Sequence, residues 1–275
     1  MIYFPNAKIN LGLQVVGRRK DGFHNLKSVF LPIGWCDILE VHLNEAGIQG
    51  KLNLVLHGLD IEDGSESNLV VRAHALLNKD FNLPEINVTL QKNIPSGAGL
   101  GGGSSDGSFM LKAINNQCKL GLDTSELENY ASKLGSDCPF FIKNEPSSVS
   151  GRGEVIKKFE VCNSLQNQEI LIVHPGVEVI TREAFKLLEL KESNLDFDYE
   201  NLQSITNYFQ GPVSKKFPEI IEALNFIESN GAHFTQMSGS GSAVFGLFDK
   251  DSVEGYKLVG KAKAKGWTAY FGALL

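Results

Sequence analysis

Alternating hydrophobic and polar positions dominate the first 60 residues. The alternation predicts strands over Ala7–Val16, Ser28–Pro32 and Ile38–Leu43, with a polar turn at Arg18–Gly22. In Lys51–His57 leucine occupies every second position, which is the period of a half-buried strand. The chain therefore begins as a β-rich region.

The hydrophobic period becomes helical after Asn68, which suits the N-cap of the predicted helix. A strand is predicted over Ile86–Leu90, and a second helical pattern contains Met110 and its neighbours. The glycine-rich segment Pro95–Ser105 therefore connects a strand to the start of a helix. A third helix is predicted from Ser125, because Ser125 and Glu128 have the spacing of a capping box.

The second half mixes strands and helices, and it contains a second loop rich in glycine and serine. The polar stretch at 145–154 predicts a boundary between two domains, residues 1–147 and 148–275. The predicted elements beyond it are strands at Glu169–His174 and Ala243–Phe248, and helices near Thr181–Leu190, Pro218–Ser229 and Ser252–Lys265.

Composition and charge exclude several classes of function. With 42% hydrophobic and 21% charged residues, the 275-residue chain is typical of a globular protein. A net charge of −6 argues against a general partner among nucleic acids or anionic membranes, which require surplus Lys and Arg. The sequence shows no signal-peptide pattern and no apolar run of the roughly 20 residues that span a bilayer. A cytoplasmic protein is predicted, whose four cysteines are free thiols because no metal or C-x-x-C spacing occurs.

The glycine-rich segment has the chemistry of a phosphate site. Glycine permits backbone turns that direct several N–H groups at a ligand, and a helix N-terminus adds the positive end of its dipole. Ser104 and Ser105 place hydroxyl groups where they could reach a phosphate or its magnesium ion.

Several kinds of nucleotide loop share such glycines. Gly97, Gly99 and Gly102 satisfy the G-x-G-x-x-G pattern of dinucleotide-binding proteins, so that class stays an alternative. However, about 90 mostly strand-like residues precede the loop, whereas the dinucleotide pattern occupies the first strand–helix turn. The loop lacks the lysine of a Walker A motif, and the chain lacks the H-R-D and D-F-G motifs of protein kinases.

Four ordered motifs resemble those of a known superfamily. Pro95–Ser105 resembles the central motif of the GHMP superfamily of small-molecule kinases, and Met237–Phe245 resembles its third motif. Two further motifs resemble the 4-diphosphocytidyl-2-C-methyl-D-erythritol kinase family within it: Ala7–Leu11 followed by Arg18-x-x-Asp21-Gly22-Phe23-His24, which together form one motif, and Leu134–Phe141. The resemblance extends over nearly the whole chain.

This resemblance implies an α+β fold with two lobes. The N-terminal lobe, residues 1–147, would resemble the second domain of ribosomal protein S5 and bind ATP, and the C-terminal lobe, residues 148–275, would be ferredoxin-like and lie on the substrate side. The implied reaction is ATP- and Mg²⁺-dependent phosphorylation of the 2-hydroxyl of 4-diphosphocytidyl-2-C-methyl-D-erythritol, in the non-mevalonate route to isoprenoids. A mevalonate or homoserine type of GHMP kinase is the alternative. The oligomeric state is left open.

The resemblance also implies the catalytic residues. Asp137 matches the family's base and Lys8 matches its partner. A carboxylate can accept the proton of an attacking hydroxyl, and an ammonium group offsets charge on the transferred phosphoryl group. The residues alone also allow a helix-capping Asp137 and a solvated Lys8.

The implied substrate contacts surround the reacting hydroxyl and the cytosine ring. Asn10 lies near the hydroxyl, Phe23 and Phe185 stack on the two faces of cytosine, His24 recognises its edge, and Thr181 is a further contact. The alternatives are a strand-end or turn asparagine, an ordinary histidine after a glycine turn, a helix-core Phe185 and a helix-capping Thr181.

The implied nucleotide contacts combine the loop with the adenine side. Helix capping is an alternative for Asn68, and a solvated strand end is one for Lys92. Asp106 departs from the usual small or amide residue, and its charge would either help to hold magnesium or weaken nucleotide binding. The contacts are Asn68, Leu69, Lys92, Pro95, Ser96, Gly97, Ala98, Gly99, Leu100, Gly101, Gly102, Gly103, Ser104 and Ser105, with Ser105 also the magnesium ligand.

Overall fold

The computed structural model describes residues 1–18, 24–59, 66–188 and 197–274. The chain forms two compact units that interleave along the sequence. The first unit comprises residues 1–7, 35–96 and 101–145, and the second comprises residues 8–34, 97–100 and 146–275. The domain boundary predicted between residues 147 and 148 stays a prediction.

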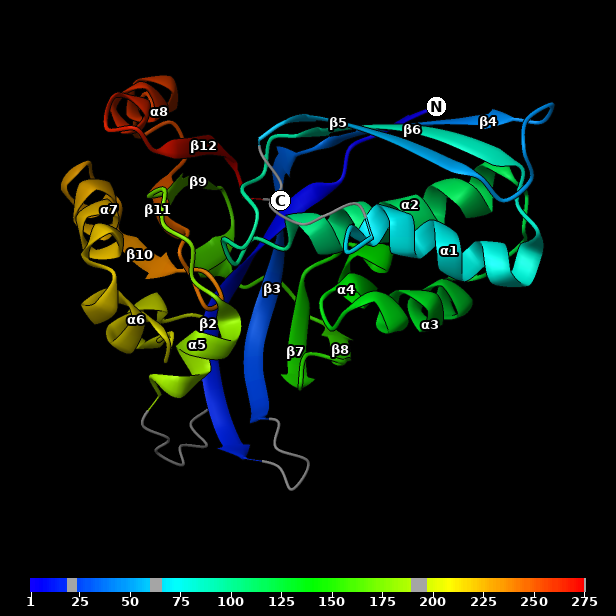
Figure 1. Cartoon of the computed structure of the whole chain (residues 1–275). Helices are drawn as coiled ribbons and strands as arrows, with labels where there is room; N and C mark the ends of the chain where they lie inside the picture. Colours follow the sequence, from blue (N-terminus) through cyan, green and yellow to red (C-terminus); the bar gives the residue numbers. More distant parts are fainter. Residues whose placement is uncertain (19–23, 60–65, 189–196, 275) are drawn as a thin grey trace. The chain divides into compact units, whose positions relative to one another are not determined.

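The first unit is a four-stranded sheet with helices (Figure 1). Its strand order is β1-β4-β6-β5; β5 pairs parallel with β6, and the other pairs are antiparallel. The elements are β1 (Ile2–Tyr3), β4 (Ile38–Asn44), β5 (Leu52–Gly58), β6 (Glu85–Lys92), α1 (Leu69–Phe81), α2 (Gly102–Gln117), α3 (Thr124–Leu134) and α4 (Cys138–Lys143).

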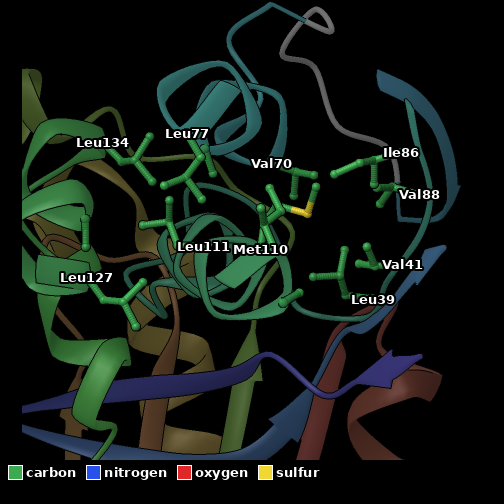
Figure 2. Packing of buried hydrophobic residues seen from close by; sticks show 14 of the residues in the cluster. Leu39, Val41, Val70, Leu77, Ile86, Val88, Met110, Leu111, Leu127 and Leu134 are labelled. Atoms are coloured by element: carbon green, nitrogen blue, oxygen red, sulfur yellow. The ribbon is translucent and has the colours of Figure 1, made fainter. Parts of the chain in front are cut away.

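Side chains from one face of this sheet meet the helices in a continuous core (Figure 2). Alternate residues of β4 and β6, among them Val41 and Val88, point to this face, as the alternating pattern predicts. Val70 of α1, Met110 of α2 and Leu127 of α3 close the core from the helix side. The core fixes α2, and with it the end of the glycine-rich loop, against the sheet.

The second unit contains two further sheets. One has the order β2-β3-β7-β8 and the other the order β10-β11-β9-β12. The first two residues of β2 and the last two of β3 belong to the first unit. The elements are β2 (Asn6–Arg18), β3 (His24–Cys36), β7 (Ser147–Gly151), β8 (Val155–Lys158), β9 (Gln168–His174), β10 (Phe234–Met237), β11 (Val244–Asp249), β12 (Thr268–Ala273), α5 (Thr181–Lys186), α6 (Gln210–Lys216), α7 (Pro218–Ser229), α8 (Gly255–Ala264) and two short 3-10 helices, Asn163–Leu165 and Leu202–Ser204.

The second of these sheets has ferredoxin-like topology. Its strands and the two helices that connect them in the ferredoxin-like pattern follow the order β9, α7, β10, β11, α8, β12, with α5, a 3-10 helix and α6 inserted between β9 and α7. The spatial order β10-β11-β9-β12 is antiparallel throughout. Leu171, Val244, Ile227 and Leu258 join β9, β11, α7 and α8 in one buried cluster. The α+β class and the ferredoxin-like topology predicted for the C-terminal half are confirmed.

The N-cap predicted for α3, Ser125, was wrong: the capping box of this helix lies two residues earlier in the chain. Asp123, not Ser125, is the N-cap: its side chain accepts the Glu126 N–H at 2.9 Å, and the Glu126 carboxylate accepts the Asp123 N–H at 2.8 Å. Further along, α8 begins at Gly255, three residues after the predicted Ser252. None of the described helices is long and apolar enough to cross a membrane.

Candidate active site

The glycine-rich loop leaves β6 and enters α2, as predicted (Figure 1). Gly97, Gly99 and Gly101 have φ angles of 63°, 77° and 71°, which side chains disfavour. Gly101 is the N-cap of α2 and has no side chain with which to cap the first amide groups of this helix. These N–H groups and the helix dipole make the start of α2 suitable for an anion.

The space around two helical glycines differs sharply. A Cβ on Gly102 would lie 2.9 Å from Cγ2 of Ile94, so close packing explains this glycine. Apart from its chain neighbours and the nearby backbone of its own helix, a Cβ on Gly103 would meet no atom of the described residues within 4 Å, and Gly103 is exposed. The hydroxyl of Ser105 is buried without a hydrogen-bond partner among the described residues. The first turn of α2 thus has an open side and a hydroxyl that suits a phosphate-bound cation.

Lys92 is not the solvated strand end that was one expectation, because only 4% of it is exposed. Its ammonium group donates to Asp37 and, at 2.6 Å, to Oδ2 of Asp106. Burial lowers the pKa of Lys92, but the two carboxylates raise it by more, so the lysine stays charged. Burial also raises the pKa of Asp106 against the opposing effect of Lys92. The unusual Asp106 is therefore part of a buried ionic cluster.

The residues expected on the adenine side lie in the first unit. Asn68 caps α1, since its Oδ1 accepts the Val70 N–H at 2.9 Å. Leu69 begins α1 at a close approach to α2, where its Cβ would lie 2.8 Å from a Cβ placed on Gly107. Helix capping thus accounts for this hydrogen bond of Asn68, and the contact of Asn68 with a nucleotide stays a prediction.

Lys8 and Asn10 lie side by side on β2 in the second unit, and each is 3% exposed. The Lys8 ammonium donates to Oδ1 of Asn10 at 2.5 Å and to the Gly99 carbonyl at 3.2 Å. It also lies 4.5 Å from the centre of the Phe30 ring. The alternatives of a solvated lysine and a turn asparagine are wrong.

Ser28 orients Asn10. The Ser28 hydroxyl donates to the Gly12 carbonyl at 2.6 Å, so it accepts from Nδ2 of Asn10 at 3.0 Å. The amide oxygen of Asn10 therefore faces Lys8. Ser238 adds a second support, because it accepts the Asn10 N–H at 3.1 Å and donates to the Gly99 carbonyl at 2.9 Å.

Asp137 lies between α3 and α4 in the first unit and is half-buried. It precedes α4, but its side chain makes no capping hydrogen bond, so capping does not explain the residue. Its Oδ1 accepts from the Ser136 hydroxyl at 3.3 Å. Cys138 beside it is fully buried, and burial raises the pKa of this thiol to about 11, in keeping with a packing role.

Two of the expected cytosine contacts meet in the second unit. The rings of His24 and Phe185 are stacked, with centroids 5.0 Å apart and planes at 17°. The Phe209 ring lies 4.9 Å from Phe185 at 84°. Thr181 is the first residue of α5 and not its cap; its hydroxyl lies 3.0 Å from that of Ser240. Phe23 lies outside the described residues.

Sequence reasoning missed three residues around these groups. Ser238 belongs to a recognised motif, but its tie to Asn10 crosses 228 positions. Ser28 and Asp37 have no local signal, since each gains its partners only when separate strands come together. The sequence shows that a serine or an aspartate lies in or beside a predicted strand, but it does not show which distant residue becomes its hydrogen-bond partner.

Two family models match this chain. The model of the GHMP kinases N terminal domain matches residues 68–145, and that of the GHMP kinases C terminal matches residues 174–258. A 4-diphosphocytidyl-2-C-methyl-D-erythritol kinase of Bacteroides fragilis is 44% identical over 261 residues, which are 91% of this chain and 93% of that protein.

Solved structures show the same fold. A 4-(cytidine 5'-diphospho)-2C-methyl-D-erythritol kinase is similar with a TM-score of 0.80 and 30% identity, covering 99% of this chain and 98% of the other. The mevalonate kinase of Methanococcus jannaschii has a TM-score of 0.74 at 12% identity, covering 100% and 98%, and shows the fold alone. The matched models, together with this identity and coverage, show that the chain belongs to the GHMP kinase family and, within it, to the 4-diphosphocytidyl-2-C-methyl-D-erythritol kinases.

Proposed function

We propose that this chain transfers the terminal phosphoryl group of ATP to the 2-hydroxyl of 4-diphosphocytidyl-2-C-methyl-D-erythritol. The main support is the 44% identical relative of that name, which matches 91% of the chain. The environment of Lys8 is a second support. A buried ammonium group is costly unless it is hydrogen-bonded, and Lys8 is buried with its ammonium group directed by Asn10 and the Gly99 carbonyl. The reaction would serve the non-mevalonate route to isoprenoid precursors.

The glycine-rich loop and the first turn of α2 would hold the phosphates of ATP. Backbone N–H groups of the loop donate to phosphate oxygens, and the open side at Gly103 leaves room for them. The unpartnered hydroxyl of Ser105 fits a ligand of Mg²⁺ that enters with the nucleotide. Magnesium supplies charge neutralisation of the phosphates during transfer.

Asp137 and Lys8 would perform the chemistry. The substrate oxygen attacks the terminal phosphorus, its proton passes to the carboxylate of Asp137, and ADP leaves. The positive charge of Lys8, fixed by Asn10 and the Gly99 carbonyl, stabilises the negative charge on the transferred group. Because Ser28 sets the direction of the Asn10 amide, the ammonium is held in place before substrate binds.

The cytidine part of the substrate would bind at the aromatic residues of the second unit. His24 and Phe185 already lie together, so one ring can offer hydrogen bonds to the edge of cytosine while the other offers a stacking face. Phe23 would supply another stacking face, and Thr181 a further polar contact. Recognition of cytosine distinguishes this substrate from mevalonate, which has no base.

A coupled assay of ADP release tests both the substrate and the base. We expect turnover of the cytidylated substrate and none of mevalonate. Asp137→Asn keeps the shape of the side chain but removes the base, and should lower kcat by about 10² to 10⁴. Asp249→Asn, at a carboxylate with 80% of its side chain exposed, is the control and should be unchanged. Equal turnover of mevalonate would refute the substrate, and an active Asp137→Asn would refute the base.

A further inference from the structure

A buried ionic cluster lies at the base of the glycine-rich loop in the first unit. Lys92 is the last residue of β6, Asp37 lies between β3 and β4, and Asp106 lies in α2. Their exposed fractions are 4%, 0% and 3%. Three separate segments of the chain therefore meet at one ammonium group.

The cluster fixes the chain where it leaves β6. Oδ1 of Asp37 accepts the N–H groups of Asn93 at 2.6 Å and of Ile94 at 2.9 Å, while Oδ2 accepts from Lys92. The Asn93 side chain adds a bond from Nδ2 to the Cys36 carbonyl at 3.0 Å. The two residues that precede Pro95 are therefore held by their backbone and by a side chain.

The same ammonium fixes the chain where it enters α2. Asp106 accepts from Lys92 at 2.6 Å, and it lies four residues after Gly102, on the same side of the helix. A Cβ on Gly102 would lie 2.9 Å from Ile94 and 3.4 Å from Nζ of Lys92. The two ends of the loop thus pack directly against each other around the cluster.

Charge balance does not require the second carboxylate. One ammonium and one carboxylate already form a neutral pair, and burial raises the pKa of Asp106 to about 8, so this second acid adds a desolvation cost that charge balance does not require. Oδ1 of Asp106 is buried and has no hydrogen-bond partner among the described residues, which adds to this cost. A feature that opposes stability in this way needs another reason, and the position of Asp106 on α2 supplies one: it ties the helix to β6.

We propose that Lys92, Asp37 and Asp106 form a clamp that positions the glycine-rich loop for the phosphates of the nucleotide. The Lys92 ammonium group, held by Asp37 and Asp106, then acts on the nucleotide through the loop, as a positioning group. The inference rests on the proposed use of ATP. Holding both ends of the loop arranges its N–H groups before the ligand arrives, which is how preorganised sites favour a transition state.

Two substitutions of Asp106 test the clamp. Asp106→Ala leaves the neutral Lys92–Asp37 pair, so the chain should fold, but it frees α2 from β6. We expect kcat/KM for ATP to fall by about 10², the loss typical of a small misplacement. Asp106→Asn keeps an oxygen acceptor for Lys92 and should restore most of this loss. Glu128→Ala breaks the partly exposed Glu128–Lys143 pair of the same unit and should change neither kcat/KM nor exchange.

Two further measurements separate this proposal from its alternatives. The fold decrease in kcat/KM caused by Asp106→Ala should be the same with ATP and with GTP. A decrease that differs between the two bases would overturn the positioning role. Hydrogen exchange at residues 93–94 and 101–105 should be faster in Asp106→Ala and near wild type in Asp106→Asn. If the wild type fails to bind ATP, the proposed function fails; if it uses ATP while Asp106→Ala matches it in kcat/KM and exchange, the clamp fails.

Discussion

Glycines in the phosphate loop are required for different physical reasons. Gly99 has a φ of 77°, and a Cβ there would lie 2.2 Å from the Ser238 carbonyl oxygen, so both conformation and space demand glycine. Gly102 is required by close packing on Ile94. Neither reason applies to Gly103, which lies in the first turn of α2 and faces open space among the described residues. Its missing side chain makes room for something outside the protein.

Gly103→Ala should therefore separate stability from binding. Alanine in a helix is more stable than glycine by about 0.5 to 1 kcal/mol, so urea unfolding should show a gain. The new methyl group would occupy the space of the phosphates, so the KM for ATP should rise at least about tenfold, or about 1.4 kcal/mol. Gly260→Ala, at an exposed glycine of α8 with equally open surroundings, should give the stability gain alone. An unchanged KM in Gly103→Ala would mean that the open space does not receive the nucleotide.

The start of α3 shows how an element can be predicted while its boundary is missed. Two acceptable capping boxes overlap here, Asp123 with Glu126 and Ser125 with Glu128. Local spacing does not distinguish them. In the structure both bonds of the first box are made, and Ser125 lies exposed in the first turn.

Alanine at the two candidate caps distinguishes them by experiment. Asp123→Ala removes the acceptor for the Glu126 N–H and should lower the free energy of unfolding by about 1 kcal/mol. Ser125→Ala should stay within about 0.5 kcal/mol, because the serine caps nothing. Urea unfolding of both variants measures the difference. A larger loss of stability in Ser125→Ala than in Asp123→Ala would mean that Ser125 is the N-cap, as the sequence pattern predicts.

Elements with a strong local period could be predicted, and those that depend on distant partners could not. Pro218–Ser229 was predicted with the bounds that the structure has, since proline begins it and its hydrophobic positions are helical. By contrast, β12 was not predicted, because its place comes from pairing with β9, about a hundred residues earlier in the chain.

The candidate site divides in the same way. Motifs identified Lys8, Asp137 and the loop as candidates, because each lies in a short continuous segment of the sequence. The burial of Lys92 could not be predicted: Asp37, its partner, lies 55 positions away, and nothing local marks it. Asp106 looked like an added charge near the phosphates, and only the fold shows that its carboxylate meets an ammonium group. Local chemistry is readable from the sequence, whereas the electrostatic environment requires the tertiary structure.

At the scale of the whole molecule, the fold alone does not select the ligand. A mevalonate kinase shares the fold at a TM-score of 0.74 over nearly the full length of both chains, although only 12% of the residues are identical. The glycine pattern also satisfies the dinucleotide motif. A measurement on the intact chain that responds to any ligand can therefore decide between nucleotides without assuming a reaction.

Thermal unfolding in the presence of ligands provides this measurement. A ligand that binds only the folded chain at 100 times its Kd adds about 2.7 kcal/mol, which corresponds to a Tm rise of roughly 5 to 10 °C at this size. We expect this rise with MgATP and with the cytidylated substrate, and none with NAD or mevalonate. At the same MgATP concentration, Gly103→Ala should lose at least about half of the rise, because a tenfold weaker Kd removes about 1.4 of the 2.7 kcal/mol. The rise with the cytidylated substrate should stay, because the new methyl group lies on α2 and the proposed cytosine contacts belong to the second unit. A rise with NAD equal to that with MgATP would contradict the kinase assignment, since the dinucleotide would then use the same loop.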